Sequence, residues 1–169
     1  ITVNGVSIGF AMTGWRVGFI GAPLWIAKAC NKIQGQVTSA TCAIAQKATE
    51  RAMLAEPKAA TKEMKETFLR RRDMLIDLLK DIPGVKCNVP NGAFYLFPDI
   101  SYYFGKSYQN IIIKNANDLC MYLLNYAHVA FVAGDAFGNP ECIRISYAAE
   151  DNKLIEAIRR VKEYLAKLI

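Results

Sequence analysis

The sequence has few of the residues that build disulfide frameworks, metal sites and histidine-based catalytic centres. Its five cysteines are odd in number, scattered along the chain and without a C-x-x-C pair. They are Cys30, Cys42, Cys87, Cys120 and Cys142. Because disulfide and zinc frameworks need paired spacing, we expect buried free thiols in a reducing cytoplasm. The single histidine, His128, has no neighbours that mark a Ser-His-Asp triad or a metal site, so we expect an ordinary histidine at a helix end.

A long apolar run and a basic leader are also missing. No apolar stretch reaches the ~18 residues that a membrane-spanning helix needs. A secretory signal begins with lysine or arginine residues, whereas residues 1–10 of this chain contain neither. Hydrophobic residues make up 53% of the chain and charged residues 21%. These proportions predict a soluble, cytoplasmic protein with a packed core and no membrane partner.

The net charge of +6 is not accompanied by the features of a nucleic-acid-binding protein. Positive residues alternate with acidic ones, as in residues 62–73, which is typical of a solvated, ion-paired helix face. Interleaved aromatic and basic residues are absent, and so are the G-x-G-x-x-G, Walker-A and H-E-x-x-H spacings. We therefore expect no nucleic-acid partner and no metal.

Periodicity and breaking residues predict a mixed succession of strands and helices. The strands are expected at 1–6, 16–20, 86–89, 93–97, 129–132 and 142–147. The helices are expected at 23–34, 41–55, 59–82 and 117–127, with a last helix whose apolar stripe is Leu154, Ile158, Val161, Leu165 and Leu168. Pro57 is expected to stop the second helix, Asn91-Gly92 to form a hairpin-like turn, and Asn117 to cap the fourth helix. Residues 102–110 and 133–140 are expected to be loops.

This order predicts an α/β part followed by an α+β part, joined by a long helix. Two strands and two helices rarely build an independent parallel sheet, so the first part resembles the end of a larger α/β domain whose beginning is absent. We place the domain boundary so that residues 1–57 are the remnant of the larger domain and residues 58–169 the smaller domain.

The most informative motif lies between Asn4 and Arg16. It contains Ser7, Phe10, Met12, Gly14 and Arg16 at the spacing Ser-x-x-Phe-x-Met-x-Gly-x-Arg. A hydroxyl at the start of a loop and a planar guanidinium suit a phosphate dianion. Taken alone, the serine would more often end a strand and the arginine pair with a surface carboxylate.

This segment resembles the cofactor-lysine segment of the fold-type I pyridoxal-phosphate-dependent aminotransferases, in its aspartate aminotransferase-like group. The resemblance implies that Ser7 and Arg16 bind the cofactor phosphate. In the family a lysine follows the serine and holds the cofactor as a Schiff base, but here that position is Ile8. An isoleucine has no nitrogen that could bond to the cofactor or move a proton, so no catalytic residue is assigned.

Further segments resemble the same family, in the family's order. Arg144 lies between two isoleucines in an apolar strand, where a cation is costly unless an anion pairs with it. The resemblance implies that Arg144 binds the substrate α-carboxylate through two parallel hydrogen bonds. Residues 91–98 and 132–138 resemble family segments to which we assign no catalytic role, and residues 36–39 lie where a loop crosses the dimer interface.

The resemblance implies transfer of an amino group between an amino acid, of aspartate type, and a 2-oxo acid, in a homodimeric parent enzyme. It corresponds to the C-terminal ~40% of a typical member. Ile8 leaves three explanations open: an inactivated remnant, a deliberate substitution, or an error in the recorded sequence. Because the other site residues keep their family identities, we favour a piece of an ordinary enzyme that is inactive by itself. The alternative is a noncatalytic oligomerisation or ligand-binding module.

Overall fold

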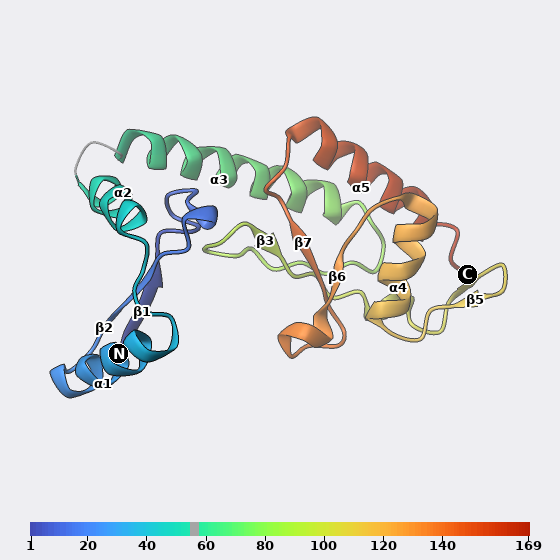
Figure 1. Ribbon diagram of the computed structural model, residues 1–169. Helices are drawn as coiled ribbons and strands as arrows, with labels where there is room; N and C mark the ends of the chain where they lie inside the picture. Colours follow the sequence, from blue (N-terminus) through green and yellow to red (C-terminus); the bar gives the residue numbers. More distant parts are fainter. Residues whose placement is uncertain (55–57) are drawn as a thin grey trace. The chain divides into compact units, whose positions relative to one another are not determined.

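The computed structural model describes residues 1–54 and 58–169 (Figure 1). The chain divides into two compact units, Ile1–Lys65 and Glu66–Ile169, each with helices and small antiparallel sheets. This confirms the mixed α/β and α+β class. The predicted long helix is α3, Lys58–Lys80, which runs from the first unit into the second. The predicted stop at Pro57 and the boundary after it lie outside the described residues, and the division into 1–57 and 58–169 stays a prediction.

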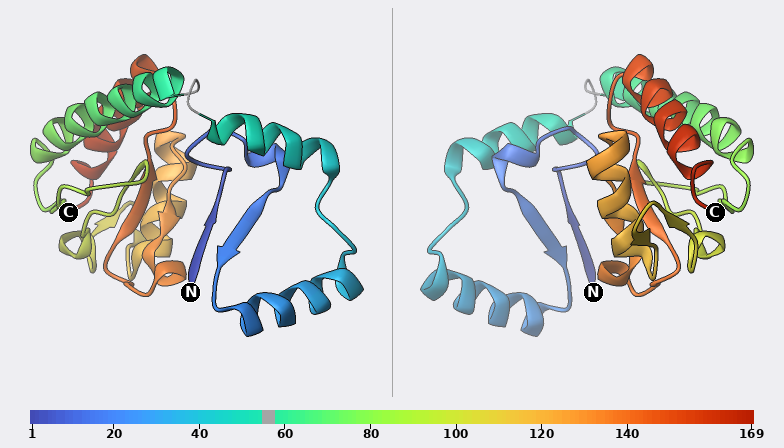
Figure 2. Two further views of the ribbon diagram at one scale, coloured as in Figure 1. Left: turned by 90° about the vertical axis from the view of Figure 1, so that its left-hand side faces the viewer. Right: turned by 90° about the vertical axis from the view of Figure 1, so that its right-hand side faces the viewer.

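The first unit contains a two-stranded ribbon and two helices (Figure 2). Strands β1 (Thr2–Gly5) and β2 (Gly18–Gly21) pair antiparallel, and a short 3-10 helix, η1 (Thr13–Trp15), lies in the loop that joins them. Helices α1 (Leu24–Val37) and α2 (Ala43–Met53) follow. Among the described residues 1–54, only Val6, Ala45 and Thr49 are buried. This unit therefore has almost no core of its own.

The second unit has a three-stranded antiparallel sheet in the order β3 (Tyr95–Leu96), β7 (Ile143–Ser146), β6 (Val132–Ala133). Helix α5 (Asp151–Leu165) lies beside α3 (Figure 2), and Arg71 Nε donates to Asp151 Oδ1 at 2.8 Å between them. All five residues of the predicted apolar stripe are buried, but α5 ends at Leu165, so Leu168 is buried beyond the helix end. The core of this unit also includes Leu75, Leu79, Leu96, Leu119, Leu123, Ile145 and Tyr147.

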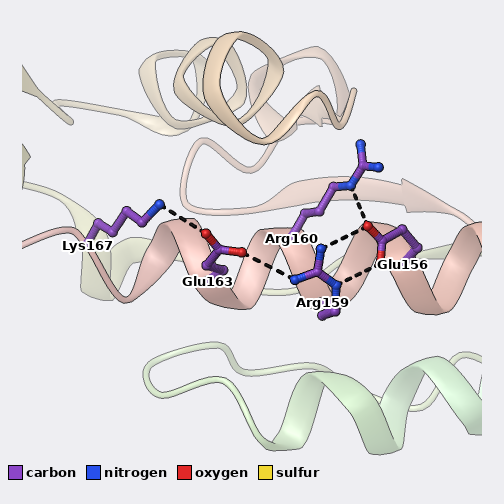
Figure 3. A network of polar contacts seen from close by, with 5 residues as sticks. All are labelled: Glu156, Arg159, Arg160, Glu163 and Lys167. Atoms are coloured by element: carbon purple, nitrogen blue, oxygen red, sulfur yellow. Dashed lines mark hydrogen bonds and ion pairs between the residues drawn. The ribbon is translucent and has the colours of Figure 1, made fainter.

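The outer face of α5 carries alternating charges, which Figure 3 shows. Glu156 accepts from Arg159 Nε at 2.7 Å and from Arg160 Nε at 2.8 Å, and Glu163 accepts from Lys167 Nζ at 3.1 Å. Hydrogen bonds from the two arginines lower the pKa of Glu156 to about 2. Part of the basic excess of the chain is thus neutralised by neighbours on the same helix.

The predicted hairpin at Asn91-Gly92 is wrong. The strand expected at 86–89 is reduced to a single bridge between Lys86 and Asp99, and β3 pairs with β7 instead of its sequence neighbour. Tyr147 makes the difference, because its hydroxyl donates to the Ala93 carbonyl at 3.1 Å and its amide to the Phe94 carbonyl at 2.9 Å. Partners distant in sequence therefore outcompete the local turn.

The helix cap at Asn117 is also wrong by two residues. Helix α4 (Ala116–Tyr122) is capped by Asn115, whose side chain accepts from the Asp118 amide at 2.9 Å. A π-helical turn, η3 (Leu123–Ala127), continues it to the predicted end. His128 follows in the left-handed conformation, with φ of 55°, and is exposed at the helix end as expected.

Three expectations also change, two about loops and one about thiols. Residues 102–110 contain ordered structure, with a 3-10 helix, η2 (Ser101–Tyr103), and the strand β4 (Ser107–Tyr108) that pairs with β5 (Ile111–Ile112). The loop expected at 133–140 contains a further 3-10 helix, η4 (Gly134–Phe137). Cys30 and Cys42 are exposed and Cys87 is half-buried, so the expectation of buried thiols holds only for Cys120 and Cys142.

None of the helices in the described residues is long and apolar enough to cross a membrane.

Candidate functional site

The loop between β1 and β2 brings together the first group of predicted site residues. Val6 is fully buried and starts the loop, with its amide directed to the Val17 carbonyl at 3.4 Å. Ser7, Ile8 and Arg16 line one cavity of about 570 Å³ in this unit. The structure thus places the predicted hydroxyl and guanidinium at the same hollow, nine residues apart in sequence.

Thr13 connects the two ends of this loop by hydrogen bonds. The sequence predicted no role for this residue. Its hydroxyl donates to the Ser7 carbonyl at 3.0 Å, and its own carbonyl accepts from Arg16 Nη1 at 3.0 Å. Arg16 has φ of 56°, a left-handed conformation uncommon for a residue with a side chain. Among the described residues Arg16 forms no ion pair, so the alternative of a surface carboxylate partner finds no support there. We define Ser7, Thr13 and Arg16 as the loop cradle.

The side chains of this loop, Ile8 among them, can be compared with what the implied cofactor, pyridoxal phosphate, requires. The Ile8 side chain is 53% exposed and lines the same cavity as Ser7 and Arg16. The cradle offers a hydroxyl and a guanidinium, which suit the phosphate group. The hydrocarbon side chain of Ile8 offers no amine. The residues present therefore fit noncovalent binding of the phosphate and do not fit a covalent link.

Arg144 lies in the second unit, on the central strand β7. Its neighbours Ile143 and Ile145 are each 3% exposed, and Arg144 itself is half-buried and points to the opposite side of the strand, as the alternation predicted. Its Cζ lies 4.5 Å from the centroid of the Tyr95 ring and 4.4 Å from that of the Phe137 ring. The cation is therefore accommodated by aromatic faces, and no carboxylate of the described residues pairs with it.

Two segments without a predicted catalytic role supply these rings. Residues 91–98 contribute Tyr95 from β3, and residues 132–138 contribute Phe137 from η4. In the sequence they were visible only as family-like companions of Arg144. Tyr95 is brought beside Arg144 by the β3–β7 pairing, in which Tyr95 lies opposite Ser146, and no local pattern reveals this pairing. Phe137 comes from the turn η4 between the paired strands β6 and β7.

The segment before Tyr95 is held in a demanding conformation. Ala93 has φ of 60°, and its carbonyl accepts the hydrogen bond from the Tyr147 hydroxyl. Burial raises the pKa of Tyr147, so its hydroxyl keeps the donated proton at neutral pH. Phe94 stacks on Phe68 of α3 with ring centroids 5.5 Å apart. These contacts fix the backbone that carries the Tyr95 ring.

Comparison with known proteins places the chain in a family. The family model for aminotransferase class I and II matches residues 1–161. The bifunctional aspartate aminotransferase and glutamate/aspartate-prephenate aminotransferase of Petunia hybrida is 47% identical over 99% of this chain and 36% of its own length. An aspartate aminotransferase of Rhizobium meliloti (strain 1021) is 45% identical over 95% of this chain and 39% of its length.

Solved structures give the same result. The crystal structure of an aspartate aminotransferase from Rhizobium meliloti has a TM-score of 0.92 at 43% identity, covering 99% of this chain and 42% of that one. An aromatic aminotransferase from Pyrococcus horikoshii has a TM-score of 0.88 at 35% identity, covering 99% and 43%. The chain therefore belongs to the class I and II aminotransferase family. It spans about two fifths of the length of the relatives it matches.

Proposed function

We propose that this chain is the C-terminal part of a pyridoxal-phosphate-dependent aminotransferase that moves an amino group between an aspartate-type amino acid and a 2-oxo acid. The shared cavity of Ser7 and Arg16, fastened by Thr13, carries the proposal. In this view Ser7 and Arg16 hold the cofactor phosphate, and Arg144 holds the substrate α-carboxylate. When bound, the cofactor supplies an electron sink for the charge that develops at the α-carbon.

The residues of the chain have separate tasks in this proposal. Thr13 keeps Ser7 and Arg16 at a fixed separation, which lowers the entropy lost when a phosphate binds. Arg144 orients a carboxylate through in-plane donors. Ile8 neither bonds to the cofactor nor accepts a proton, so we expect the chain by itself to be inactive in amino transfer. Residues 1–57 then belong to the cofactor-binding domain and residues 58–169 to the smaller domain of a cytoplasmic homodimeric enzyme.

A binding experiment with pyridoxine 5′-phosphate tests the phosphate site. This probe has the phosphate and lacks the aldehyde, so it cannot react with surface lysines. We expect the wild-type chain to bind it more tightly than pyridoxine, which has no phosphate, in equilibrium dialysis. Arg16→Gln removes a charged donor and should weaken binding roughly tenfold to a hundredfold, while Arg159→Gln on α5 should leave it unchanged. Equal affinity of Arg16→Gln and wild type would refute the assignment.

A second experiment tests Ile8. Pyridoxal phosphate is added to wild type and to Ile8→Lys, the samples are reduced with borohydride, and the peptide containing residue 8 is analysed by mass spectrometry. We expect an adduct at residue 8 in Ile8→Lys alone. A reduced adduct localised to residue 8 of wild type, as distinct from one on the α-amine of Ile1, would contradict the reading of this position.

Two observations favour a noncatalytic module as the second candidate. One is Ile8; the other is the exposure of large apolar residues on α1 and α2, where Trp25 and Ile44 are each 73% exposed. Such residues favour burial against another protein surface. Sedimentation velocity measures whether the wild-type chain forms a stable oligomer. A stable oligomer that does not bind pyridoxine 5′-phosphate would support this candidate over the first.

A further inference from the structure

The guanidinium of Arg144 is flanked by two aromatic rings that come from different parts of the chain. The centroids of Tyr95 and Phe137 lie 4.5 and 4.4 Å from Arg144 Cζ. The two rings make no ring contact with one another among the described aromatic pairs, so they approach the guanidinium from different sides. We call Arg144, Tyr95 and Phe137 the arginine stack.

Each ring is itself held in place. Tyr95 sits opposite Ser146 in the β3–β7 pair, and its ring lies 4.6 Å from that of Phe94. Phe137 meets the Phe97 ring edge-on, with centroids 6.1 Å apart and planes at 90°. The turn that carries Phe137 is tied to β7 by the Gly134 amide, which donates to the Cys142 carbonyl at 2.8 Å. Both rings are therefore held by contacts within the second unit.

The two rings compensate the positive charge of the half-buried Arg144 guanidinium. A half-buried arginine without an anion is destabilising, and proteins commonly compensate it with a carboxylate that occupies the N–H donors. Aromatic faces compensate the charge in another way, because the ring quadrupole attracts the cation and leaves its in-plane N–H groups unspent. A carboxylate can then bind to these in-plane N–H groups.

We propose that Tyr95 and Phe137 are positioning residues that hold the Arg144 guanidinium ready for a coplanar, bidentate carboxylate. The inference rests on the proposed function, in which Arg144 binds the substrate carboxylate. A pre-oriented fork loses less conformational entropy on binding than a mobile one, so the rings raise the affinity for a carboxylate that they do not touch.

The experiment uses the full chain with ¹⁵N-labelled arginine and L-aspartate as the probe. The Nε–H resonance of Arg144, assigned by its loss in Arg144→Lys, reports the ring currents, and isothermal titration calorimetry gives the dissociation constant of L-aspartate for wild type and for every variant. We expect Tyr95→Leu and Phe137→Leu each to move this resonance toward that of exposed arginines and to weaken L-aspartate binding roughly threefold to tenfold. Tyr95→Phe, which keeps the ring, should restore what Tyr95→Leu loses.

A matched control comes from another cation–ring contact in the same unit. Lys167 Nζ lies 3.7 Å from the centroid of the Tyr164 ring, so Tyr164→Leu removes a comparable contact that has no part in the stack. We expect it to leave the Arg144 resonance and the affinity unchanged. Phe137 is 47% exposed, so Phe137→Leu removes little core and decides the question if Tyr95→Leu fails to fold.

The outcomes separate this inference from the function on which it rests. If Arg144→Lys loses L-aspartate binding while both leucine variants keep the wild-type resonance and affinity, the inference is overturned and the role of Arg144 stands. If Arg144→Lys binds L-aspartate as tightly as wild type, the role of Arg144 fails and the inference fails with it.

Discussion

Replacing Gly134 by alanine should selectively destabilise the second unit. An added Cβ would lie 2.1 Å from the Asn139 carbonyl oxygen and 2.5 Å from the Cys142 carbonyl oxygen. Both oxygens belong to backbone that cannot rotate away. The same turn is closed by hydrogen bonds from the Gly134 amide to the Cys142 carbonyl at 2.8 Å and from the Asn139 amide to the Gly134 carbonyl at 3.1 Å.

The cost follows from these contacts. If the turn opens to relieve the overlap, two hydrogen bonds of about 1 kcal/mol each are lost. If the turn stays closed, the packing strain costs about 1–3 kcal/mol. We therefore expect Gly134→Ala to lower the free energy of unfolding by about 1–3 kcal/mol. Gly92→Ala is the matched control, because nothing lies within 4 Å of its added Cβ, and we expect a change within about 0.5 kcal/mol.

The chain provides a separate optical signal for each unit. All eight tyrosines lie in the second unit, and both tryptophans, Trp15 and Trp25, lie in the first. Urea unfolding followed by tyrosine near-ultraviolet circular dichroism should show the loss in Gly134→Ala, while tryptophan fluorescence should be unchanged. A tyrosine transition within about 0.5 kcal/mol of wild type would refute the reasoning.

Three further predictions use the same unfolding and labelling measurements. Asn115→Ala should lower the stability of the second unit by about 1 kcal/mol through loss of the helix cap, whereas Asn117→Ala should not; the reverse order would restore the sequence-based assignment. Two arginines of α3 lower the pKa of Asp151 from 3.8 to about 2, so its contribution to stability is present above pH 4 and lost as the pH falls toward 2. Asp151→Asn should flatten that acid dependence, and an unchanged profile would exclude the ion pairs as its cause. Burial raises the pKa of Cys120 to about 11, so it should react with a disulfide reagent only after unfolding, whereas exposed Cys30 reacts at once; equal rates would contradict the burial.

The elements that sequence predicted well are those governed by local periodicity. In α5 the spacing of Leu154, Ile158, Val161 and Leu165 describes one helix face, and all four are buried. Helix α3 was predicted at 59–82 and is observed at Lys58–Lys80, so each end lies within two residues of the prediction. A helix closes its hydrogen bonds within itself, so its own residues suffice to predict it.

The wrong predictions concern pairing between distant segments. Asn91-Gly92 has the composition of a tight hairpin, but Tyr147 binds the following backbone and β7 provides the partner strand. Residues 107–112 have no strong strand pattern, yet they pair as β4 and β5. Two-residue strands carry too little sequence signal to be recognised without their partners.

The sequence by itself determined the family, the loop motif with Ser7 and Arg16, the substitution at Ile8 and the candidate carboxylate-binding Arg144, because these depend on residue identity and order. The tertiary structure decided how those residues are held. Thr13 joins the two ends of the loop by hydrogen bonds that side-chain type alone does not predict. Tyr95 reaches Arg144 through the β3–β7 pairing of segments distant in sequence, and Phe137 reaches it from the turn between β6 and β7. Only the folded chain brings the two rings to the same guanidinium.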